Sequence, residues 1–362
     1  MNPASLLPDL PAGARILILR LRSIGDIILL TPTLRLLKDW RPDLRISVMV
    51  EARFRDLLEG NPAVEEILTP GEGSAVRKLL RRMALVRDLR RRGFSLCVNL
   101  HGGPTSRLFL RWRAAPLRVG FAHFRGANLY NVLIPDARTV LNQPSLHTAE
   151  HQAAAFFYLG LPRKEIPRAQ IFSGAGQAAW WDAKRASLGI AAGKSYAIIH
   201  PTALYKTKEW APEGFARIGE YLERKSGVTP IYSCGPGEAP VLDAVEKASG
   251  APLRRLEGVS LAQFAAALVG ARLFVGNDSG PAHMAAALAR PEVVIFGSSS
   301  SPIWGPWPRQ GSNRGARVVQ NPFDCNPCPG DRCYQFARPE CILSVTFDQV
   351  KDAIEEALAQ SS

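Results

Sequence analysis

Short apolar runs alternate along the whole chain with longer segments whose apolar positions recur at helical spacing. This alternation predicts parallel strands joined by crossover helices, which is an α/β fold. The predicted strands span residues 15–20, 46–50, 64–69, 96–100, 119–121, 196–199, 228–233, 273–275 and 292–296, and the predicted helices span 27–37, 75–92, 147–159, 213–225, 261–268 and 348–358.

A chain of 362 residues is long enough for two domains of ordinary size. Proline and glycine are frequent between Pro162 and Gly176, where we place the interdomain linker. We expect the Pro-rich residues up to Gly13 to be loose. No run of eighteen apolar residues occurs, and the first fifteen residues lack the basic and apolar regions of a secretory signal. We therefore expect a cytoplasmic location.

Residues 273–297 read as a strand, a tight loop, a helix and a second strand. Ser279 suits a helix N-cap, and Pro281 suits the first helical turn. In open α/β sheets ligands bind at the carboxyl ends of strands, and free N–H groups at a helix start favour phosphate. Asp278 would then accept hydrogen bonds from sugar hydroxyls, and His283 would face the ligand. An ordinary crossover helix with a core-facing histidine explains the same residues equally well.

Polar residues follow other predicted strands as well. In the first half, Asp26 comes after strand 15–20 and is either a helix N-terminal acid or a carboxylate presented as a base. Polar and flexible residues from Asn99 to Pro104 follow strand 96–100, and the loop 122–135 holds a mixture suited to an anionic acceptor. In the second half, a lysine in the loop 203–212 would supply a phosphate counter-charge.

The turn after strand 228–233 is Cys-Gly-Pro-Gly-Glu, ending at Glu238, a carboxylate that would hold a ribose. It is not the dinucleotide-binding fingerprint, because Pro240 occupies the position of the third glycine.

The net charge of +13 is unevenly distributed. Residues 1–175 hold 26 Lys and Arg against 14 Asp and Glu, a balance of +12, and the remainder holds 19 against 18. A basic half favours nucleic acid, anionic lipid or a phosphorylated substrate as partner. A genome that prefers arginine to lysine explains the excess as well. The predicted helix 75–92 carries eight basic residues and one acid, so it is either a solvated outer helix or a contact with anionic headgroups.

Three motifs in this order resemble glycosyltransferase family nine, the ADP-heptose:lipopolysaccharide heptosyltransferases. They are Ser23-Ile24-Gly25-Asp26, Lys208-Glu209-Trp210-Ala211-Pro212 and Asp278-Ser279-Gly280-Pro281-Ala282-His283. The resemblance covers residues 15 to 358. It implies a GT-B architecture of two Rossmann-like, doubly wound domains facing across a cleft. Residues 1–165 would bind the acceptor and residues 176–345 the nucleotide sugar, and a helix within 346–362 would pack back across the junction.

The resemblance also implies the roles of individual residues. Asp26 matches the general base and Lys208 the pyrophosphate lysine, although Lys206 is a second lysine two positions earlier. The other expected donor-binding residues are Thr202, Glu238, Asp278, Ser279, Gly280 and His283, and the expected acceptor-binding residues are Arg22, Ser23, Gly25, His101, Arg107 and Arg125. The chain has no Asp-x-Asp motif, which fits transfer without a catalytic metal.

The expected reaction is an inverting transfer of heptose from ADP-heptose to the inner core of lipopolysaccharide. The acceptor is anionic and lies at the cytoplasmic face of the inner membrane, where a peripheral contact is expected. Two alternatives stay open. The same fold would serve another nucleotide sugar or a protein acceptor. A basic nucleic-acid-binding protein is disfavoured because no nucleic-acid-binding motif is present. The sequence leaves open the acceptor hydroxyl, the donor sugar and the number of subunits.

Six cysteines in a chain of this length do not suggest a disulfide scaffold. Cys97 and Cys234 fall in or beside strands and are expected to be core thiols. The other four form a C-x2-C-x4-C-x7-C pattern in a Pro/Gly-rich loop, and such a pattern fits a structural zinc or iron site as well as a loop of reduced thiols or a stress-formed disulfide. Some members of the family carry such a cluster. The four residues are Cys325, Cys328, Cys333 and Cys341.

Overall fold

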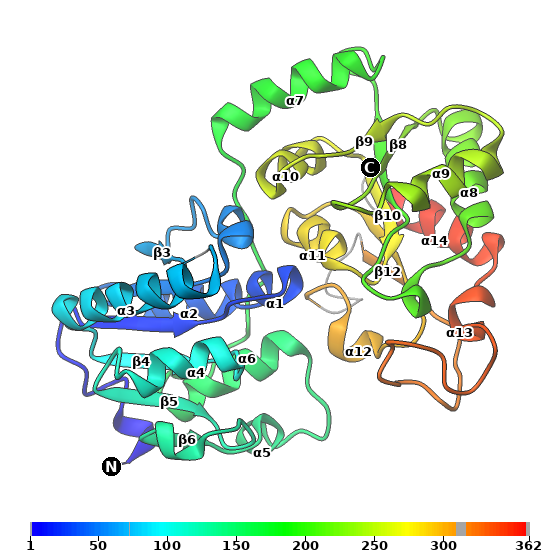
Figure 1. Ribbon diagram of the computed structural model, residues 1–362. Helices are drawn as coiled ribbons and strands as arrows, with labels where there is room; N and C mark the ends of the chain where they lie inside the picture. Colours follow the sequence, from blue (N-terminus) through cyan, green and yellow to red (C-terminus); the bar gives the residue numbers. More distant parts are fainter. Residues whose placement is uncertain (1, 72, 309–315, 360–362) are drawn as a thin grey trace. The chain divides into compact units, whose positions relative to one another are not determined.

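The computed structural model describes residues 2–71, 73–308 and 316–359 and forms two compact units, Met1–Ile171 and Phe172–Ser362 (Figure 1). The division between the units falls inside the range that the sequence predicts as linker. No helix in the described ranges is long and apolar enough to cross a membrane.

The first unit is built on a parallel six-stranded sheet with the strand order β3-β2-β1-β4-β5-β6. The strands are β1 (Arg15–Leu19), β2 (Arg45–Met49), β3 (Glu66–Leu68), β4 (Leu96–Asn99), β5 (Leu117–Phe121) and β6 (Val132–Ile134). The helices are η1 (Pro3–Ser5), α1 (Ile24–Ile28), α2 (Thr31–Trp40), η2 (Ala52–Leu57), α3 (Ala75–Arg92), α4 (Pro104–Arg111), η3 (Ala127–Leu129), α5 (Ala137–Leu141) and α6 (Thr148–Tyr158). Four of the five residues of β1 are buried, as expected for a central strand of a parallel sheet.

The structure differs from the sequence prediction around residues 27–37 and 122–135 of the first unit. The helix expected over 27–37 is two helices, α1 and α2, because the chain turns at Leu29 and Leu30 before Pro32 starts the second. Proline suits a first helical turn, since the N–H that it lacks would have no intrahelical acceptor there. The expected loop 122–135 contains the edge strand β6, whose three residues are too few to show a pattern.

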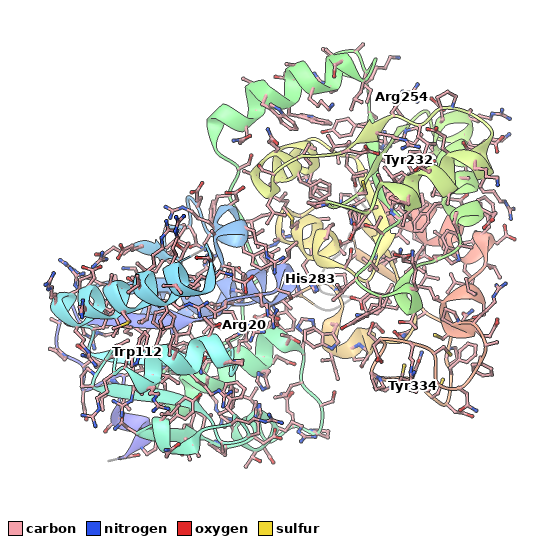
Figure 2. All side chains as sticks on the ribbon, in the orientation of Figure 1. Arg20, Trp112, Tyr232, Arg254, His283 and Tyr334 are labelled. Atoms are coloured by element: carbon pink, nitrogen blue, oxygen red, sulfur yellow. The ribbon has the colours of Figure 1, made fainter. Side chains whose placement is uncertain are left out.

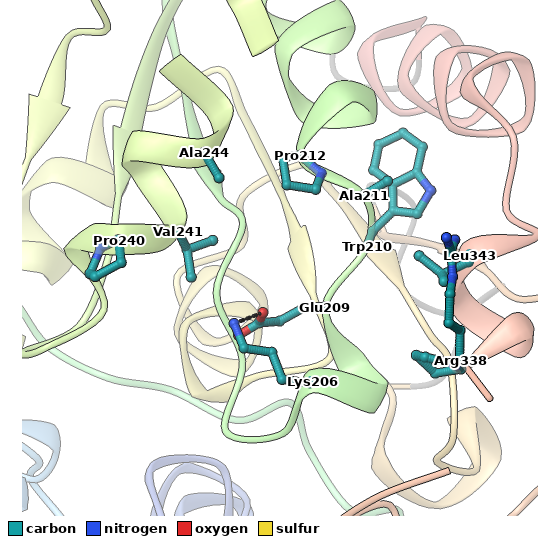
Figure 3. A pocket seen from close by; sticks show the side chains of 11 residues that line it. Lys206, Glu209, Trp210, Ala211, Pro212, Pro240, Val241, Ala244, Arg338 and Leu343 are labelled. Carbon is teal, nitrogen blue, oxygen red and sulfur yellow. Dashed lines mark hydrogen bonds and ion pairs between the residues drawn. The ribbon is translucent and has the colours of Figure 1, made fainter. Parts of the chain in front are cut away.

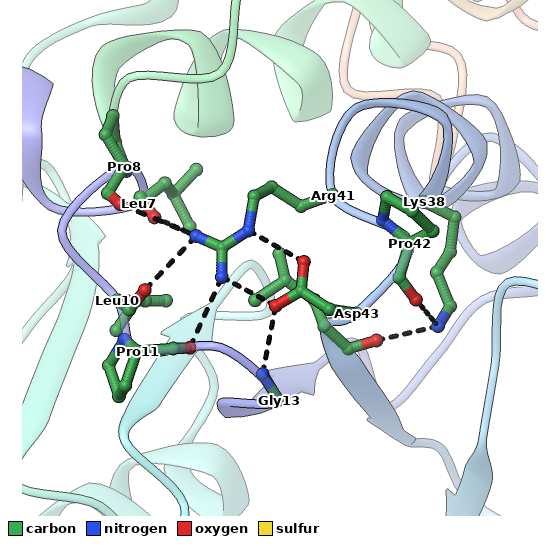
Figure 4. A network of polar contacts seen from close by, with 10 residues as sticks. Leu7, Pro8, Leu10, Pro11, Gly13, Lys38, Arg41, Pro42 and Asp43 are labelled. Carbon is green, nitrogen blue, oxygen red and sulfur yellow. Dashed lines mark hydrogen bonds and ion pairs between the residues drawn. The ribbon is translucent and has the colours of Figure 1, made fainter.

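The N-terminal segment is held in place rather than loose, which corrects the sequence expectation (Figure 4). Arg41 donates hydrogen bonds to the carbonyl oxygens of Leu10 and Pro11 at 3.2 and 3.3 Å. Asp43 pairs with Arg41 and accepts a hydrogen bond from the Gly13 N–H at 2.9 Å. These contacts hold the pKa of the Asp43 carboxyl well below its usual range. Leu7 is fully buried, so the segment contributes to the core.

The second unit repeats this topology, with the strand order β12-β11-β10-β7-β8-β9. The strands are β7 (Tyr196–His200), β8 (Thr229–Ser233), β9 (Arg255–Leu256), β10 (Leu273–Asn277), β11 (Glu292–Ile295) and β12 (Ala316–Val319). The helices are α7 (Ala175–Ser187), η4 (Lys206–Lys208), α8 (Pro212–Lys225), α9 (Ala239–Ser249), α10 (Leu261–Val269), α11 (Gly280–Ala287), α12 (Ser301–Trp304), α13 (Glu340–Leu343) and α14 (Phe347–Ala359). The helix α14 packs on β11, β12 and α8 of its own unit, and its contact across the junction stays a prediction.

Candidate functional site

Each sheet reverses its direction of winding between its first and fourth strands. In the first unit these neighbours are β1 and β4, and in the second they are β7 and β10. The carboxyl ends of two such strands form a crevice where ligands of open α/β sheets bind. The residues predicted from sequence follow these strands, so the two crevices are the candidate sites.

In the second unit, Asn277 ties together the loops that follow β7 and β10. Its Nδ2 donates to the carbonyl oxygen of Pro201 at 2.8 Å, and its Oδ1 accepts from the Trp210 N–H at 3.1 Å. Asn277 is fully buried, and both bonds are shielded from water. The sequence analysis did not single out this residue, although an amide at the end of an apolar strand is a recognisable signal.

Lys208 and Asp278 meet at this crevice. The Lys208 Nζ lies 2.7 Å from Asp278 Oδ2, and their side chains are 21% and 7% exposed. The hydroxyl of Ser299, which the sequence analysis did not identify, donates to the same carboxylate oxygen. Lys206 instead pairs with Glu209 at 2.5 Å and is 80% exposed. Of the two lysines, Lys208 is therefore the one held in the crevice.

The start of α11 is open to an anion. Ser279 occupies the N-cap position, but its hydroxyl makes no capping hydrogen bond. Its Oγ is buried and has no hydrogen-bond partner among the residues that the structure describes. The N–H groups at the start of α11, Gly280 included, therefore lack a side-chain acceptor. Backbone donors of this kind and the helix dipole together favour a phosphate.

Three further predicted donor residues are engaged within the unit. The Thr202 hydroxyl lies 2.9 Å from Nε2 of His200, and Thr202 is fully buried. Glu238 shapes the turn after β8, because its Oε2 accepts from the Gly235 N–H at 2.8 Å. His283 lies on α11, where Figure 2 marks it, and is 6% exposed. This burial agrees with the core-facing interpretation of the histidine.

A cavity of about 340 Å³ lies beside the loop that carries the two lysines (Figure 3). Lys206, Glu209 and Trp210 of this loop line it, together with Val241 of α9 and Arg338. None of the predicted donor residues lines this cavity. The crevice between β7 and β10, where Lys208 meets Asp278, therefore stays the candidate site.

In the first unit, Asp26 lies in the first turn of α1, and its carboxylate is 16% exposed. The guanidinium of Arg20 pairs with one carboxylate oxygen, and the Ser23 hydroxyl donates to the other at 3.1 Å. Gln152 donates to the Asp26 carbonyl at 2.9 Å and so ties α1 to α6. Gly25 is buried beneath this turn. The sequence analysis placed Arg20 in a strand and gave it no role in the site. The signal that could have identified it is a charged residue at the end of an apolar run.

His101 follows β4 and lies in the same electrostatic environment. Burial lowers the pKa of His101, and the positive charges of Arg20 and Arg22 lower it further. The Asn99 Oδ1 accepts from the His101 N–H at 3.1 Å and so fixes the turn. The structure thus brings Asp26, Arg22 and His101 together.

The other two predicted acceptor residues lie on neighbouring segments. Arg107 is half-buried on α4, and its side chain lies beside Gly126 of the following loop. Arg125 is exposed in that loop.

The four-cysteine loop contacts the loops that follow β7 and β11. The Cys328 N–H donates to the Ser298 carbonyl at 3.1 Å, and the Thr207 hydroxyl donates to the Gly330 carbonyl. Burial raises the pKa of the Cys341 thiol, and the three other thiols raise it further. Nevertheless, no three His, Cys, Asp or Glu side chains in the described ranges are arranged to hold a metal ion. The described residues therefore do not form the predicted metal shell.

The family model of glycosyltransferase family 9 (heptosyltransferase) matches residues 82–334, which is more than half of the chain. The chain belongs to glycosyltransferase family 9. This family 9 enzyme is 24% identical over 294 residues to lipopolysaccharide heptosyltransferase 3 of Escherichia coli K12, covering 79% of this chain and 83% of the relative. The assignment to the heptosyltransferase family from three short motifs is confirmed.

Solved structures confirm the GT-B type of fold for the family 9 enzyme. A family 9 glycosyltransferase from Veillonella parvula superposes with a TM-score of 0.84 at 20% identity, covering 97% of this chain and 99% of the other. Heptosyltransferase WaaC of E. coli with ADP gives 0.67 at 21% identity, covering 95% and 99%. The E. coli protein TibC, described as iron-containing and dodecameric, gives 0.56 at 16% identity, covering 98% and 78%.

Proposed function

We propose that this glycosyltransferase moves heptose from ADP-heptose to an anionic acceptor of the lipopolysaccharide core, with inversion at the anomeric carbon. The observation that carries the proposal is the Lys208–Asp278 pair beside the uncapped start of α11. It combines a cation, a sugar-binding carboxylate and free backbone donors in one crevice. Relatives that are lipopolysaccharide heptosyltransferases, and a neighbour solved with ADP, support this donor and this acceptor.

On the donor side, the diphosphate binds at the start of α11 with Ser279 and Gly280. Lys208 and the helix N–H groups offset the charge that grows on the diphosphate as the bond to the sugar breaks. The Asp278 carboxylate accepts hydrogen bonds from the sugar hydroxyls, and Glu238 those of the ribose. Thr202 acts indirectly in this proposal, because its hydroxyl is already bound to His200.

On the acceptor side, Asp26 removes the proton of the attacking hydroxyl as the new bond forms on the face opposite ADP. Arg20 pairs with this carboxylate, and the Ser23 hydroxyl donates a hydrogen bond to it. Positive charge from Arg22, Arg107 and Arg125 suits an acceptor rich in carboxylates and phosphates. Because that acceptor is lipid-linked, the enzyme works peripherally at the cytoplasmic face of the inner membrane.

The proposal is tested first by thermal shift with ADP-heptose, ADP-glucose and UDP-sugars, since only a ligand that prefers the native state raises Tm. We expect ADP-heptose to give the largest rise. Transfer is then measured with lipid-linked core acceptor and with a protein acceptor, and the anomeric configuration of the product is determined. A larger rise with a UDP-sugar, or transfer only to protein, would replace the proposed donor or acceptor. Binding of a labelled oligonucleotide at physiological salt without any sugar-nucleotide response would replace the enzyme proposal altogether.

A further inference from the structure

The helix α3 exposes a stripe of large apolar side chains. Val76, Leu79, Leu80 and Met83 are 69%, 47%, 60% and 36% exposed. Their spacing of three and four residues places them on one face of the helix, so they form one continuous patch. An exposed patch of this kind marks an interaction surface more often than chance exposure of a single residue does.

The core does not need this patch. The helix is anchored through Val86 and Leu89, which are 3% and 0% exposed and pack in the core cluster with Phe94 and Leu110. The apolar stripe adjoins this buried edge, since Val86 follows Met83 by three residues, but its own side chains are exposed. Its aliphatic side chains therefore remain unburied within the described chain.

Arginines continue the exposed face beyond the apolar stripe. Arg87 and Arg91 lie four and eight residues after Met83, so they extend the same face into the second half of the helix. Arg77, Lys78, Arg87 and Arg91 make no ion pair within the part of the chain that the structure describes. The only acid of the helix, Asp88, is already paired with Arg92 at 2.6 Å.

We propose that α3 binds the surface of a bilayer that contains anionic lipid. Its aliphatic stripe enters the boundary between headgroups and acyl chains, while the free arginines bind phosphate groups. Nucleic acid would satisfy the arginines but would leave the aliphatic stripe in water. Since this surface lies in the half that carries a balance of +12, long-range attraction adds to the contact. The inference rests on the proposed function only in naming which membrane is bound. Its test measures vesicle binding and does not require sugar transfer.

The test is cosedimentation of the full chain with phosphatidylcholine vesicles, with and without phosphatidylglycerol. Wild type is compared with Leu79→Ser/Leu80→Ser and with Arg87→Gln/Arg91→Gln. The matched control for the leucine variant is Val269→Ser, because Val269 is an apolar residue on α10 that is 47% exposed. The matched control for the arginine variant is Arg224→Gln/Lys225→Gln on α8. The Tm of every variant is measured, and transfer to an acceptor freed of lipid is assayed alongside.

We expect wild type to bind only the anionic vesicles, less tightly as salt is added. The leucine variant should bind roughly tenfold more weakly, because two aliphatic side chains are lost. The arginine variant should lose about fivefold for each arginine. The controls should bind like wild type, and every variant should keep its Tm and its activity on the lipid-free acceptor.

Equal binding of wild type and the leucine variant to anionic vesicles would overturn the inference, as would the absence of binding by wild type. So would an oligonucleotide that displaces wild type from vesicles and binds the leucine variant equally well, because α3 would then be a nucleic-acid surface. If wild type binds anionic vesicles as expected but transfers no sugar, the proposed function is contradicted and this inference still holds.

Discussion

Lys208 Nζ lies 2.7 Å from Asp278 Oδ2, so a residue after β7 and a residue after β10 share one ion pair. A charge-assisted contact to phosphate in this crevice is worth more than an exposed ion pair, which contributes under about 1 kcal/mol. We expect Lys208→Ala to raise the Kd for ADP by about tenfold or more. Lys206→Ala, the matched control on the same loop, should raise it by less than about fivefold. Isothermal titration with ADP measures both, and a larger loss for Lys206 would mean that the motif is misaligned by two residues.

Asp26→Asn should abolish most of the turnover and leave ADP binding intact. The amide cannot accept the proton of the acceptor hydroxyl, and general base catalysis contributes about 10²–10⁴-fold. Turnover and ADP affinity are measured on the same preparation. Asp39→Asn is the matched control, because Asp39 is an exposed carboxylate on α2 of the same unit. Turnover of Asp26→Asn within tenfold of wild type would exclude Asp26 as the base.

The protein should lose stability as the pH falls below about 6.5. Burial lowers the pKa of His151 to about 4, with further lowering by His123 and Arg20. The unfolded chain therefore binds the proton first, and the contribution of His151 is present above pH 6.5 and lost as the pH falls to about 4. His151→Phe keeps a ring against Phe121, whose centroid lies 4.4 Å from that of His151. Denaturant midpoints should fall less steeply with pH in this variant, and an unchanged slope would assign the effect to other groups.

Transfer should proceed at an unchanged rate after treatment with a chelator. In the proposed reaction Lys208 and the start of α11 supply the charge that stabilises the leaving diphosphate, and the sequence has no Asp-x-Asp motif. Elemental analysis of untagged protein tests the separate prediction of a structural metal at the four-cysteine loop. About one zinc or iron per chain would support that prediction. If the chelator reduced turnover before any loss of fold, metal-independent chemistry would be contradicted. In the elemental analysis, a metal content near zero in active protein would mean that the four thiols are ordinary loop residues.

Much of the fold could be predicted because each central strand is a short, continuous apolar run. The ranges expected around Ile46 and Leu273 fall on β2 and β10, and the helix expected over 75–92 is found over those residues. Short or peripheral elements escaped prediction. The two residues of β9 are too few for a pattern, and the split between α1 and α2 depends on local backbone turns.

The candidate site was partly predictable for a similar reason. Asp26, Lys208 and Asp278 follow strand ends, and strand order brings such ends together. The side chains that position them were not predictable. Arg20 and Asn277 lie within or directly after apolar runs and read as strand residues, and only the tertiary structure shows which partners they reach.

The hydrogen bond from the Thr207 hydroxyl to the Gly330 carbonyl has a consequence for synthesis on the ribosome. The first sheet is complete once β6 has been made, so that unit has all its strands while the remainder is still being translated. In the second unit, β10 lies beside β7 at the centre of the sheet but follows it by more than seventy residues. The loop that carries Lys208 is held by this hydrogen bond only after Gly330 has left the ribosome. A nascent chain therefore has every strand of its first unit before it can form this hydrogen bond, and a chain terminated before Gly330 lacks this contact between the Lys208 loop and the cysteine loop.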